Sequence, residues 1–416
     1  MSRDPPPSLT RRRLLSAAVA AAATTTLPVR AAASLPTTWI PPDWLLDDLP
    51  RQMRALGVPG IGIAVVEDGA LAWSRSVGIA DATRGTPVDD TSLWEAASLS
   101  KPVFAYAVLQ LVDRGELALD APLVRYARPA YLGTSPWLDQ ITVRDVLRHT
   151  TGLPNWRKDP AHEPLLPAVA PGTRIDYSGE AFTWLQLAVE AVTGESLEQS
   201  LHRLLFDPAG MRDSSYGWDA AMAARSVFGH RGPDDVQPEL PPQGLRDAWE
   251  AAQPVALRWG KPLSDWRYAD AEHALPLVQA GARAGVAHWP GDILANAAAS
   301  LRCTVRDYAR HMALVVHPPR APWALRETTR NAMLSAQIAL PGRYTEKTLG
   351  WNLEPTRIGP VLYHSGSNAG VFKTFALGDA ARGRALVVMT NAASGNLLYR
   401  RVVRAATGLD LLAFDL

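Results

Sequence analysis

The sequence predicts an α/β (α+β) fold in which an antiparallel sheet, flanked by helices, is built from both ends of the chain. Strand-like alternation around a tight turn at Asp68-Gly69 and four short apolar runs between residues 350 and 390 support this prediction. Helical patterns dominate the stretch between them. We therefore expect an α/β sandwich domain made of residues 34–118 and 291–416, with a mainly helical domain, residues 119–290, inserted into it.

The composition indicates a globular protein and argues against several kinds of partner. Of the 416 residues, 47% are hydrophobic and 20% are charged, which is ordinary for a chain with a sizeable core. Lys+Arg at 42 against Asp+Glu at 41 leaves a net charge of +1, so we expect no binding to nucleic acid. The single cysteine, Cys303, lies in an apolar helical pattern and is predicted to be a core residue. We expect neither a metal nor another cofactor.

The first 33 residues are predicted to be an export signal. Arginines at positions 11–13 precede an Ala-rich apolar run, and three alanines at 31–33 offer a small-residue cleavage site before Ser34. The paired arginines resemble a twin-arginine signal. The alternative is a membrane anchor, but the run at residues 14–28 is shorter than the ~20 residues that a span requires. We therefore expect a periplasmic or extracellular protein with no stable membrane span in its mature form.

The first predicted elements of the mature chain are a helix and a β-hairpin. A helical pattern ends at Gly57, and residues 61–65 then alternate in strand fashion. Asp68-Gly69 predicts a tight turn, after which residues 71–73 continue a return strand. The sheet is therefore expected to start before the next helix.

That next helix is predicted to begin near Ser98 and to end before Gly115. Pro102 is tolerated only in a first turn, and Gly115 can adopt the left-handed conformation that ends a helix. Lys101 lies one turn beyond Ser98, so the two side chains stand side by side. A desolvated lysine with a lowered pKa can remove the proton of a serine hydroxyl, which makes Ser98 the candidate nucleophile. Alone, the pair could equally be a surface serine beside a solvated lysine.

The middle of the chain is predicted to be helical and its last part to return to strands. Helical stretches at 143–148 and 181–192 are separated by Pro- and Gly-rich turns. Residues 230–288 show no long periodicity, so we expect loops and short helices that frame a cleft; a disordered insert is the alternative. The later predicted strands are residues 350–353, 361–364, 371–377 and 385–390, followed by a helix at 397–406.

Two further motifs join the Ser-Lys pair. Tyr177-Ser178-Gly179 lies on a loop just before a predicted helix, and His364-Ser365-Gly366 ends an apolar strand. Here the chain resembles the serine β-lactamase and penicillin-binding family, in the branch of class C β-lactamases, DD-carboxypeptidases, D-aminopeptidases and related esterases. The resemblance covers most of the mature chain and includes residues 60–66, 147–153, 300–307 and 349–351.

The resemblance implies a β-lactamase/transpeptidase-like fold and a role for each motif. Ser98 would form an acyl-enzyme, while Lys101 and Tyr177 would move the proton to the leaving group and later activate water. The backbone N–H groups of Ser98 and Ser367 would hold the oxyanion. The predicted catalytic residues are Ser98, Lys101, Tyr177 and His364, and the predicted substrate-binding residues are Ser365, Gly366, Ser367 and Gly179. Singly, Tyr177 could be an aromatic residue that packs a helix start; His149 is predicted to be structural.

Two departures from the family motifs bear on the substrate. Gly179 stands where many members have the Asn of Tyr-x-Asn, and His364 stands where β-lactamases have the Lys of Lys-Thr-Gly. Lys347, in a similar short run, is assigned to an exposed turn before the strand. Because a histidine is mostly neutral at pH 7, we expect β-lactams to be slow substrates or inhibitors, with small esters or D-amino acid amides turned over faster. The difference should soften as the pH falls and His364 gains a proton.

The sequence therefore predicts an exported, cofactor-free serine hydrolase that acts on the amide or ester bond of a small-molecule or peptide substrate. A carboxylesterase on the same scaffold is an alternative within enzymes, since acyl-enzyme chemistry does not distinguish esters from amides. The alternative from another class is a non-catalytic penicillin-binding or sensor protein that is acylated without turnover.

Overall fold

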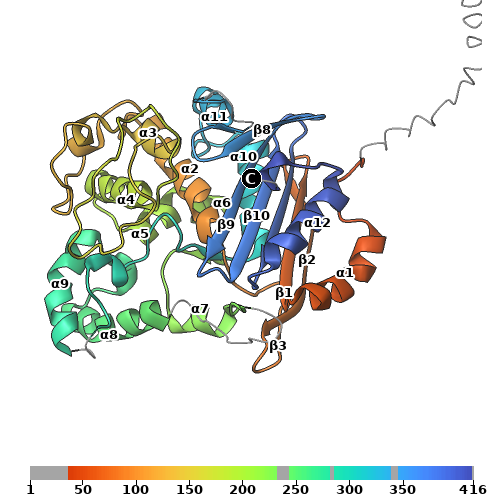
Figure 1. The fold of residues 1–416 in the computed structure, drawn as a ribbon, viewed down its shortest axis with the longest axis horizontal. Coiled ribbons are helices and arrows are strands. Elements are labelled where there is room, and N and C mark those ends of the chain that lie inside the picture. Colours follow the sequence, from red (N-terminus) through yellow and green to blue (C-terminus); the bar gives the residue numbers. More distant parts are fainter. Residues whose placement is uncertain (1–35, 232–242, 282–284, 339–344, 415–416) are drawn as a thin grey trace, which may run out of the picture. The chain divides into compact units, whose positions relative to one another are not determined.

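A computed structural model describes residues 36–231, 243–281, 285–338 and 345–414 (Figure 1). The predicted export signal, residues 1–33, lies outside the described residues. The described part is organised around an eight-stranded sheet with the order β3-β2-β1-β11-β10-β9-β8-β7, in which all neighbours are antiparallel. None of its helices is long and apolar enough to cross a membrane.

The strands of this sheet come from both ends of the chain, as the sequence predicts. They are β1 (Gly60–Glu67), β2 (Ala70–Asp81), β3 (Thr86–Pro87), β7 (Glu346–Lys347), β8 (Asn352–Thr356), β9 (Gly359–Asn368), β10 (Phe372–Asp379) and β11 (Arg384–Thr390). A second, smaller sheet contains three strands in the order β4 (Trp94–Glu95), β6 (Arg302–Cys303) and β5 (Ser214–Ser215). Cys303 is buried, as expected, but it lies in a strand and not in a helix.

Helices cover both faces of the large sheet, and the remaining helices belong mostly to the middle of the chain (Figure 1). The α-helices are α1 (Asp43–Leu56), α2 (Ser100–Asp113), α3 (Val143–Leu147), α4 (Gly179–Thr193), α5 (Leu197–Leu201), α6 (Asp207–Ala209), α7 (Ala220–Arg225), α8 (Gln243–Trp259), α9 (Tyr268–Gly281), α10 (Val305–Val316), α11 (Glu327–Leu334) and α12 (Gly395–Thr407).

The alternation of β1 explains why helices pack on both faces. Ile61, Ile63 and Val65 belong to the core that the sheet shares with α1 and α12. Ala64 and Val66, which point the other way, belong to the core that contains α2 and α10. Neither face of β1 is therefore exposed to solvent, and its residues are buried along almost the whole strand.

The local predictions at the start of the chain are confirmed. Gly57 ends α1 in the left-handed conformation, with a φ of 62°. Asp68 and Gly69 turn the chain between β1 and β2 with φ values of 48° and 73°, both in the left-handed region that two-residue hairpin turns of type I′ require. The hairpin thus brings the chain back along β1 before it reaches α2.

The prediction of loops and short helices at residues 230–288 is wrong in part, because this stretch contains the long helices α8 and α9. Both helices have an internal proline, Pro254 and Pro276, which obscured the helical pattern. Their contact is also built largely from alanine instead of leucine or isoleucine. The buried alanines of the two helices are Ala248, Ala252, Ala256, Ala271 and Ala274.

Candidate active site

Ser98 lies on a short 3₁₀ turn, Ala97–Leu99, that leads directly into α2. Ala97 has a φ of 52°, a conformation that costs a residue with a side chain on the order of 1–3 kcal/mol. The turn is fixed by Ser100, whose hydroxyl donates to the Ala97 carbonyl at 2.6 Å and accepts the Leu301 N–H at 3.0 Å. Ser98 is partly exposed while both of its neighbours are buried. The fold therefore presents this one hydroxyl to the outside from a rigid turn.

The ammonium group of Lys101 lies beside this hydroxyl. Its Nζ is 3.5 Å from Ser98 Oγ and donates to the Ala298 carbonyl at 2.9 Å. The side chain is only 1% exposed, and the loss of hydration lowers its pKa to about 7, with a further contribution from the positive charge of Lys347. A lysine with that pKa is about half neutral at pH 7, so it can accept the serine proton.

Tyr177 is held over Lys101 by an aromatic stack. The His149 ring lies 4.4 Å from the Tyr177 ring at an interplanar angle of 30°, and its Nδ1 accepts the Ser178 N–H at 3.2 Å. Lys101 Nζ lies 4.6 Å from the Tyr177 ring centroid. Burial raises the pKa of Tyr177, opposed by its proximity to Ser98, and its hydroxyl has no partner of normal geometry among the described residues. The phenol therefore stays protonated near neutral pH and can act as a proton donor.

His364 lies in β9 and completes this cluster. Its ring centroid is 6.2 Å from that of Tyr177, and its Nδ1 lies 2.8 Å from the Ser365 carbonyl, which can only accept. Burial, followed by the charges of Lys347 and Lys101, lowers the pKa of His364 to about 3. The expectation that His364 gains a proton as the pH falls is therefore wrong for any ordinary assay pH. Its ring is neutral and supplies no cation.

The backbone of β9 lies against the turn that carries Ser98, and the closest approach is at Gly366. A Cβ on Gly366 would lie 2.8 Å from the Ala96 carbonyl and 3.0 Å from the Ala97 Cβ, so only glycine allows this approach. Ser365 and Ser367 alternate with Gly366 and are exposed on the other face, where Ser367 Oγ accepts from Lys373 Nζ at 2.8 Å. Contacts of Ser365 and Ser367 with a substrate would therefore involve their backbone groups.

Position 179 has no room for a side chain, which the sequence alone does not reveal. A Cβ at Gly179 would lie 2.3 Å from the indole ring of Trp156, and the Gly179 N–H donates to Asn155 Oδ1 at 3.0 Å. The Trp156 side chain, 45% exposed, occupies the space where the side-chain amide was expected. This part of the site is thus an apolar wall instead of a hydrogen-bonding group.

The predicted position of Lys347 is wrong. It was expected in an exposed turn, but it lies in strand β7, is partly buried, and places its Nζ 6.0 Å from the Tyr177 ring centroid. Its Nζ also donates to Asn352 Oδ1. β7 pairs with β8 and β8 with β9, so the order of the sheet brings Lys347 to the cluster. The available signal was a lysine just before the predicted strand at residues 350–353, and this position alone does not show which way the side chain points.

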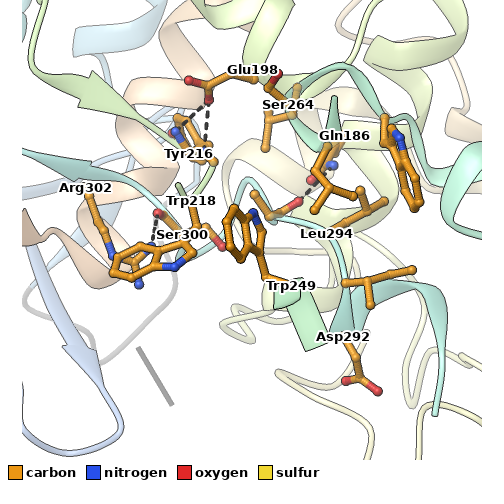
Figure 2. Close-up of a pocket in the computed structure, with 16 residues that line it drawn as sticks. Gln186, Glu198, Tyr216, Trp218, Trp249, Ser264, Asp292, Leu294, Ser300 and Arg302 are labelled. Carbon is orange, nitrogen blue, oxygen red and sulfur yellow. Dashed lines mark hydrogen bonds between the residues drawn. The ribbon is translucent and has the colours of Figure 1, made fainter. Parts of the chain in front are cut away.

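A separate pocket lies beside the small sheet, and Figure 2 shows Trp218 and Trp249 in its wall. The guanidinium of Arg302 lies 4.7 Å from the Trp218 ring centroid and pairs with Glu95 at 3.1 Å. Glu95 in turn accepts from the side chain of Asn368, the last residue of β9. Hydrogen bonds therefore connect the wall of this pocket to β9, the strand that lies against the Ser98 turn. The four predicted catalytic residues do not line it.

The described residues contain no group of three or more His, Cys, Asp or Glu side chains that could hold a metal ion. The chemistry that the cluster offers is that of its own groups. A serine hydroxyl, a partly neutral lysine and a protonated phenol surround one partly exposed point, which is the arrangement that nucleophilic acyl transfer requires.

Known proteins resemble this chain in sequence. A family profile described as Beta-lactamase matches residues 46–408. Esterase EstB of Burkholderia gladioli is 32% identical over 243 residues, covering 51% of this chain and 58% of the esterase. A D-aminopeptidase of Cereibacter sphaeroides is 30% identical over 212 residues, covering 47% of this chain and 39% of the peptidase. The matches thus span about half of these relatives or less.

A crystal structure of a class C beta lactamase from Rhodobacter sphaeroides shares the fold. Its TM-score is 0.63 with 16% sequence identity, and the alignment covers 88% of this chain and 97% of that one. At this identity the likeness concerns the arrangement of helices and strands. It confirms the predicted mixed fold with an antiparallel sheet flanked by helices.

Proposed function

The chain belongs to the Beta-lactamase family, whose profile covers residues 46–408, and we propose that it is a serine hydrolase that cleaves ester or amide bonds through an acyl-enzyme on Ser98. The observation that carries this proposal is the contact between Ser98 Oγ and Lys101 Nζ at 3.5 Å, in surroundings that lower the pKa of Lys101 to about 7. The names of the esterase and D-aminopeptidase relatives support the same reaction class.

In the proposed mechanism, neutral Lys101 takes the proton of Ser98 while Oγ attacks the acyl carbon of the substrate. The oxyanion that forms is held by the backbone N–H groups of Ser98 and Ser367. The Tyr177 hydroxyl gives its proton to the leaving group and regains one from the Lys101 ammonium, which restores neutral Lys101. Water then attacks the acyl carbon of the acyl-enzyme and gives a proton to neutral Lys101. The bond between the acyl carbon and Ser98 Oγ breaks, Oγ takes this proton back from the Lys101 ammonium, and the acid product leaves.

We further propose that small esters or D-amino acid amides are turned over faster than β-lactams. The place of the side-chain amide that would hold the acyl amide of a β-lactam is filled by Trp156, packed on Gly179. His364 stays neutral where a β-lactamase has a permanent cation. Losing one charge-assisted hydrogen bond corresponds to roughly ten- to a hundredfold in rate. β-Lactams are then expected to acylate Ser98 and to leave slowly.

A comparison of kcat/KM for a short-chain p-nitrophenyl ester and a chromogenic cephalosporin tests this function. We expect ester turnover to exceed cephalosporin turnover by at least tenfold, and intact mass to show a cephalosporin-derived adduct that outlasts the ester-derived one. A D-amino acid p-nitroanilide serves as the amide substrate in the same assay. Adducts that form with every substrate and never turn over would instead favour a penicillin-binding sensor protein.

We also propose that the protein is exported through a twin-arginine signal, on the arginines at positions 11–13 and the alanine-rich run behind them. Replacing Arg11 and Arg12 together by lysine should leave the full-length precursor in the cytoplasm. Cell fractionation with N-terminal sequencing of the exported form is the measurement, and the exported wild-type chain should begin near Ser34. An exported chain that keeps its first 33 residues would contradict this proposal.

A further inference from the structure

The backbone carbonyl that accepts from Lys101 belongs to a short segment without polar side chains. Lys101 Nζ donates to the Ala298 carbonyl at 2.9 Å. Ala298 is the middle residue of a turn of three alanines, residues 297–299, that belongs to neither a helix nor a strand. The next carbonyl, that of Ala299, accepts from the side chain of Asn368 at 3.0 Å. Alanine side chains form no hydrogen bonds, so other residues must hold these two carbonyls in place.

Gln186, in the middle of α4, binds this segment with both ends of its side-chain amide. Its Oε1 accepts the Ala297 N–H at 2.9 Å, and its Nε2 donates to the Ala295 carbonyl at 3.3 Å. Because a backbone N–H only donates and a carbonyl only accepts, these two partners determine which end of the amide is the oxygen. The Gln186 side chain is buried, so bulk water does not compete for either bond.

A buried carboxylate holds the same amide from the other side. Glu190, one turn further along α4, accepts from Gln186 Nε2 at 2.9 Å and from the Tyr268 N–H at 2.8 Å. Burial raises the pKa of Glu190 to about 7, against the opposing effect of these two hydrogen bonds. Nε2 thus has one acceptor for each of its two hydrogens. The Gln186 side chain cannot turn away without leaving buried polar groups unpaired.

The Ala298 carbonyl limits the directions in which the amino group of Lys101 can point. A neutral lysine has two N–H groups and one lone pair, and only the lone pair can take the proton of Ser98. While one N–H is bound to Ala298, the lone pair stays within reach of Ser98 Oγ, 3.5 Å from Nζ. A displacement of about 1 Å in a catalytic group can lower a rate by on the order of 10²-fold. A residue that fixes this carbonyl therefore affects the reaction without touching the substrate.

We propose that Gln186 is a positioning residue that fixes the Ala298 carbonyl and, through it, the amino group of Lys101. This inference rests on the proposed function, in which Lys101 is the base for Ser98. It gives a role to a residue outside the motifs that the sequence offers. Gln186 also lines the pocket shown in Figure 2, so the wall of that pocket and the support of Lys101 share one side chain.

Gln186→Met tests this inference, because methionine is also long and unbranched but makes none of these hydrogen bonds. The measurement is kcat/KM for p-nitrophenyl acetate from about pH 5 to about pH 9. We expect the level that kcat/KM reaches above pH 7 to fall by roughly ten- to a hundredfold. A carbonyl stabilises an ammonium group more than a neutral amine. Its displacement should therefore also move the midpoint of the rise in kcat/KM to lower pH, by about half a unit or more.

The midpoint of this rise is a readout that a general loss of packing would not move. The variant leaves the titratable groups that face Lys101 unchanged. These groups are Tyr177, His149, His364 and Lys347. Glu190→Gln shows whether the rise comes from Glu190 instead, whose pKa is also about 7. It should keep the rise and its midpoint, because an amide oxygen at position 190 can still accept from Gln186.

Gln110→Met is the matched control. Gln110 is also buried, and its Nε2 donates to two distant backbone carbonyls, those of Leu204 at 2.9 Å and Trp323 at 2.7 Å. It lies on α2, the helix that carries Lys101, but these two bonds hold segments other than the one with Ala298. Gln110→Met should therefore lower thermal stability and leave both the midpoint and the level of kcat/KM unchanged.

A midpoint that is unchanged or raised in folded Gln186→Met, or the same shift in Gln110→Met, would overturn the inference. If Gln186→Met does not fold, Gln186→Asn provides the same test with the same expected shift, because its amide is one methylene too short to reach both backbone partners. If the proposed function itself were wrong, the wild-type protein would show no Ser98-dependent hydrolysis or no rise in kcat/KM near pH 7. That result differs from a wild-type rise whose midpoint Gln186→Met does not change.

Discussion

Replacing Ser98 by alanine is expected to abolish turnover and covalent labelling together. Removing the nucleophile of a serine hydrolase lowers kcat by on the order of 10⁶-fold, because the remaining groups can only bind the substrate and stabilise charge. Ser98 Oγ is the hydroxyl that lies 3.5 Å from the partly neutral Lys101. A fluorophosphonate should add its mass to the peptide that contains Ser98 in the wild-type protein and to no peptide of Ser98→Ala. The same variant should lose p-nitrophenyl ester hydrolysis to the same extent.

Two neighbouring serines provide the controls for this experiment. Ser100 is buried with its hydroxyl bonded to Ala97 and Leu301, and Ser365 is exposed on the far face of β9. Ser365→Ala should therefore keep both labelling and turnover. Adduct at Ser100 or Ser365, or undiminished hydrolysis by Ser98→Ala, would assign the nucleophile elsewhere. Thermal unfolding of Ser98→Ala should resemble that of the wild-type protein, since the hydroxyl is partly exposed.

The parts of the fold that could be predicted are those that local chemistry decides. Gly57 ends a helix and Asp68-Gly69 turns a hairpin because few other residues adopt positive φ values, so both positions mark their elements in the sequence itself. The strands near the end of the chain alternate or run apolar because both sheet faces are buried. Such patterns can be interpreted from the local sequence alone, because contacts with distant residues do not change them.

What could not be predicted depends on contacts between distant segments. The Trp156 ring packs on Gly179, which lies 23 residues later in the chain. A glycine at position 179 does not indicate in the sequence which side chain fills the space beside it. Lys347 reaches the site only through the order of strands β7, β8 and β9, which the sequence does not specify. Helices α8 and α9 were hidden because alanines make their contact and each holds a proline. The Ser-Lys pair was accessible because one helical turn fixes its geometry.

The second large expected effect concerns the separate roles of Lys101 and Tyr177 in proton transfer, which the pH dependence of kcat/KM should reveal. Lys101, with a pKa lowered to about 7, can be neutral at assay pH, whereas burial raises the pKa of Tyr177 and keeps its proton in place. Lys101 is then the base and Tyr177 the donor. A base must be unprotonated, so wild-type kcat/KM should rise about tenfold per pH unit below pH 7 and become level above it.

Lys101→Met should lower kcat/KM by on the order of 10²–10⁴-fold and should abolish the rise of kcat/KM near pH 7, because no group remains that titrates there as the base. Methionine fills the same buried space without an ammonium group to desolvate, so thermal unfolding should show no loss of stability. Tyr177→Phe should also lose activity but should keep the rise near pH 7, since Lys101 still accepts the serine proton. With leaving groups that need no protonation, such as p-nitrophenolate, its loss should be small, and it should grow with poorer leaving groups. A rise in kcat/KM that disappears in Tyr177→Phe and persists in Lys101→Met would reverse the two assignments.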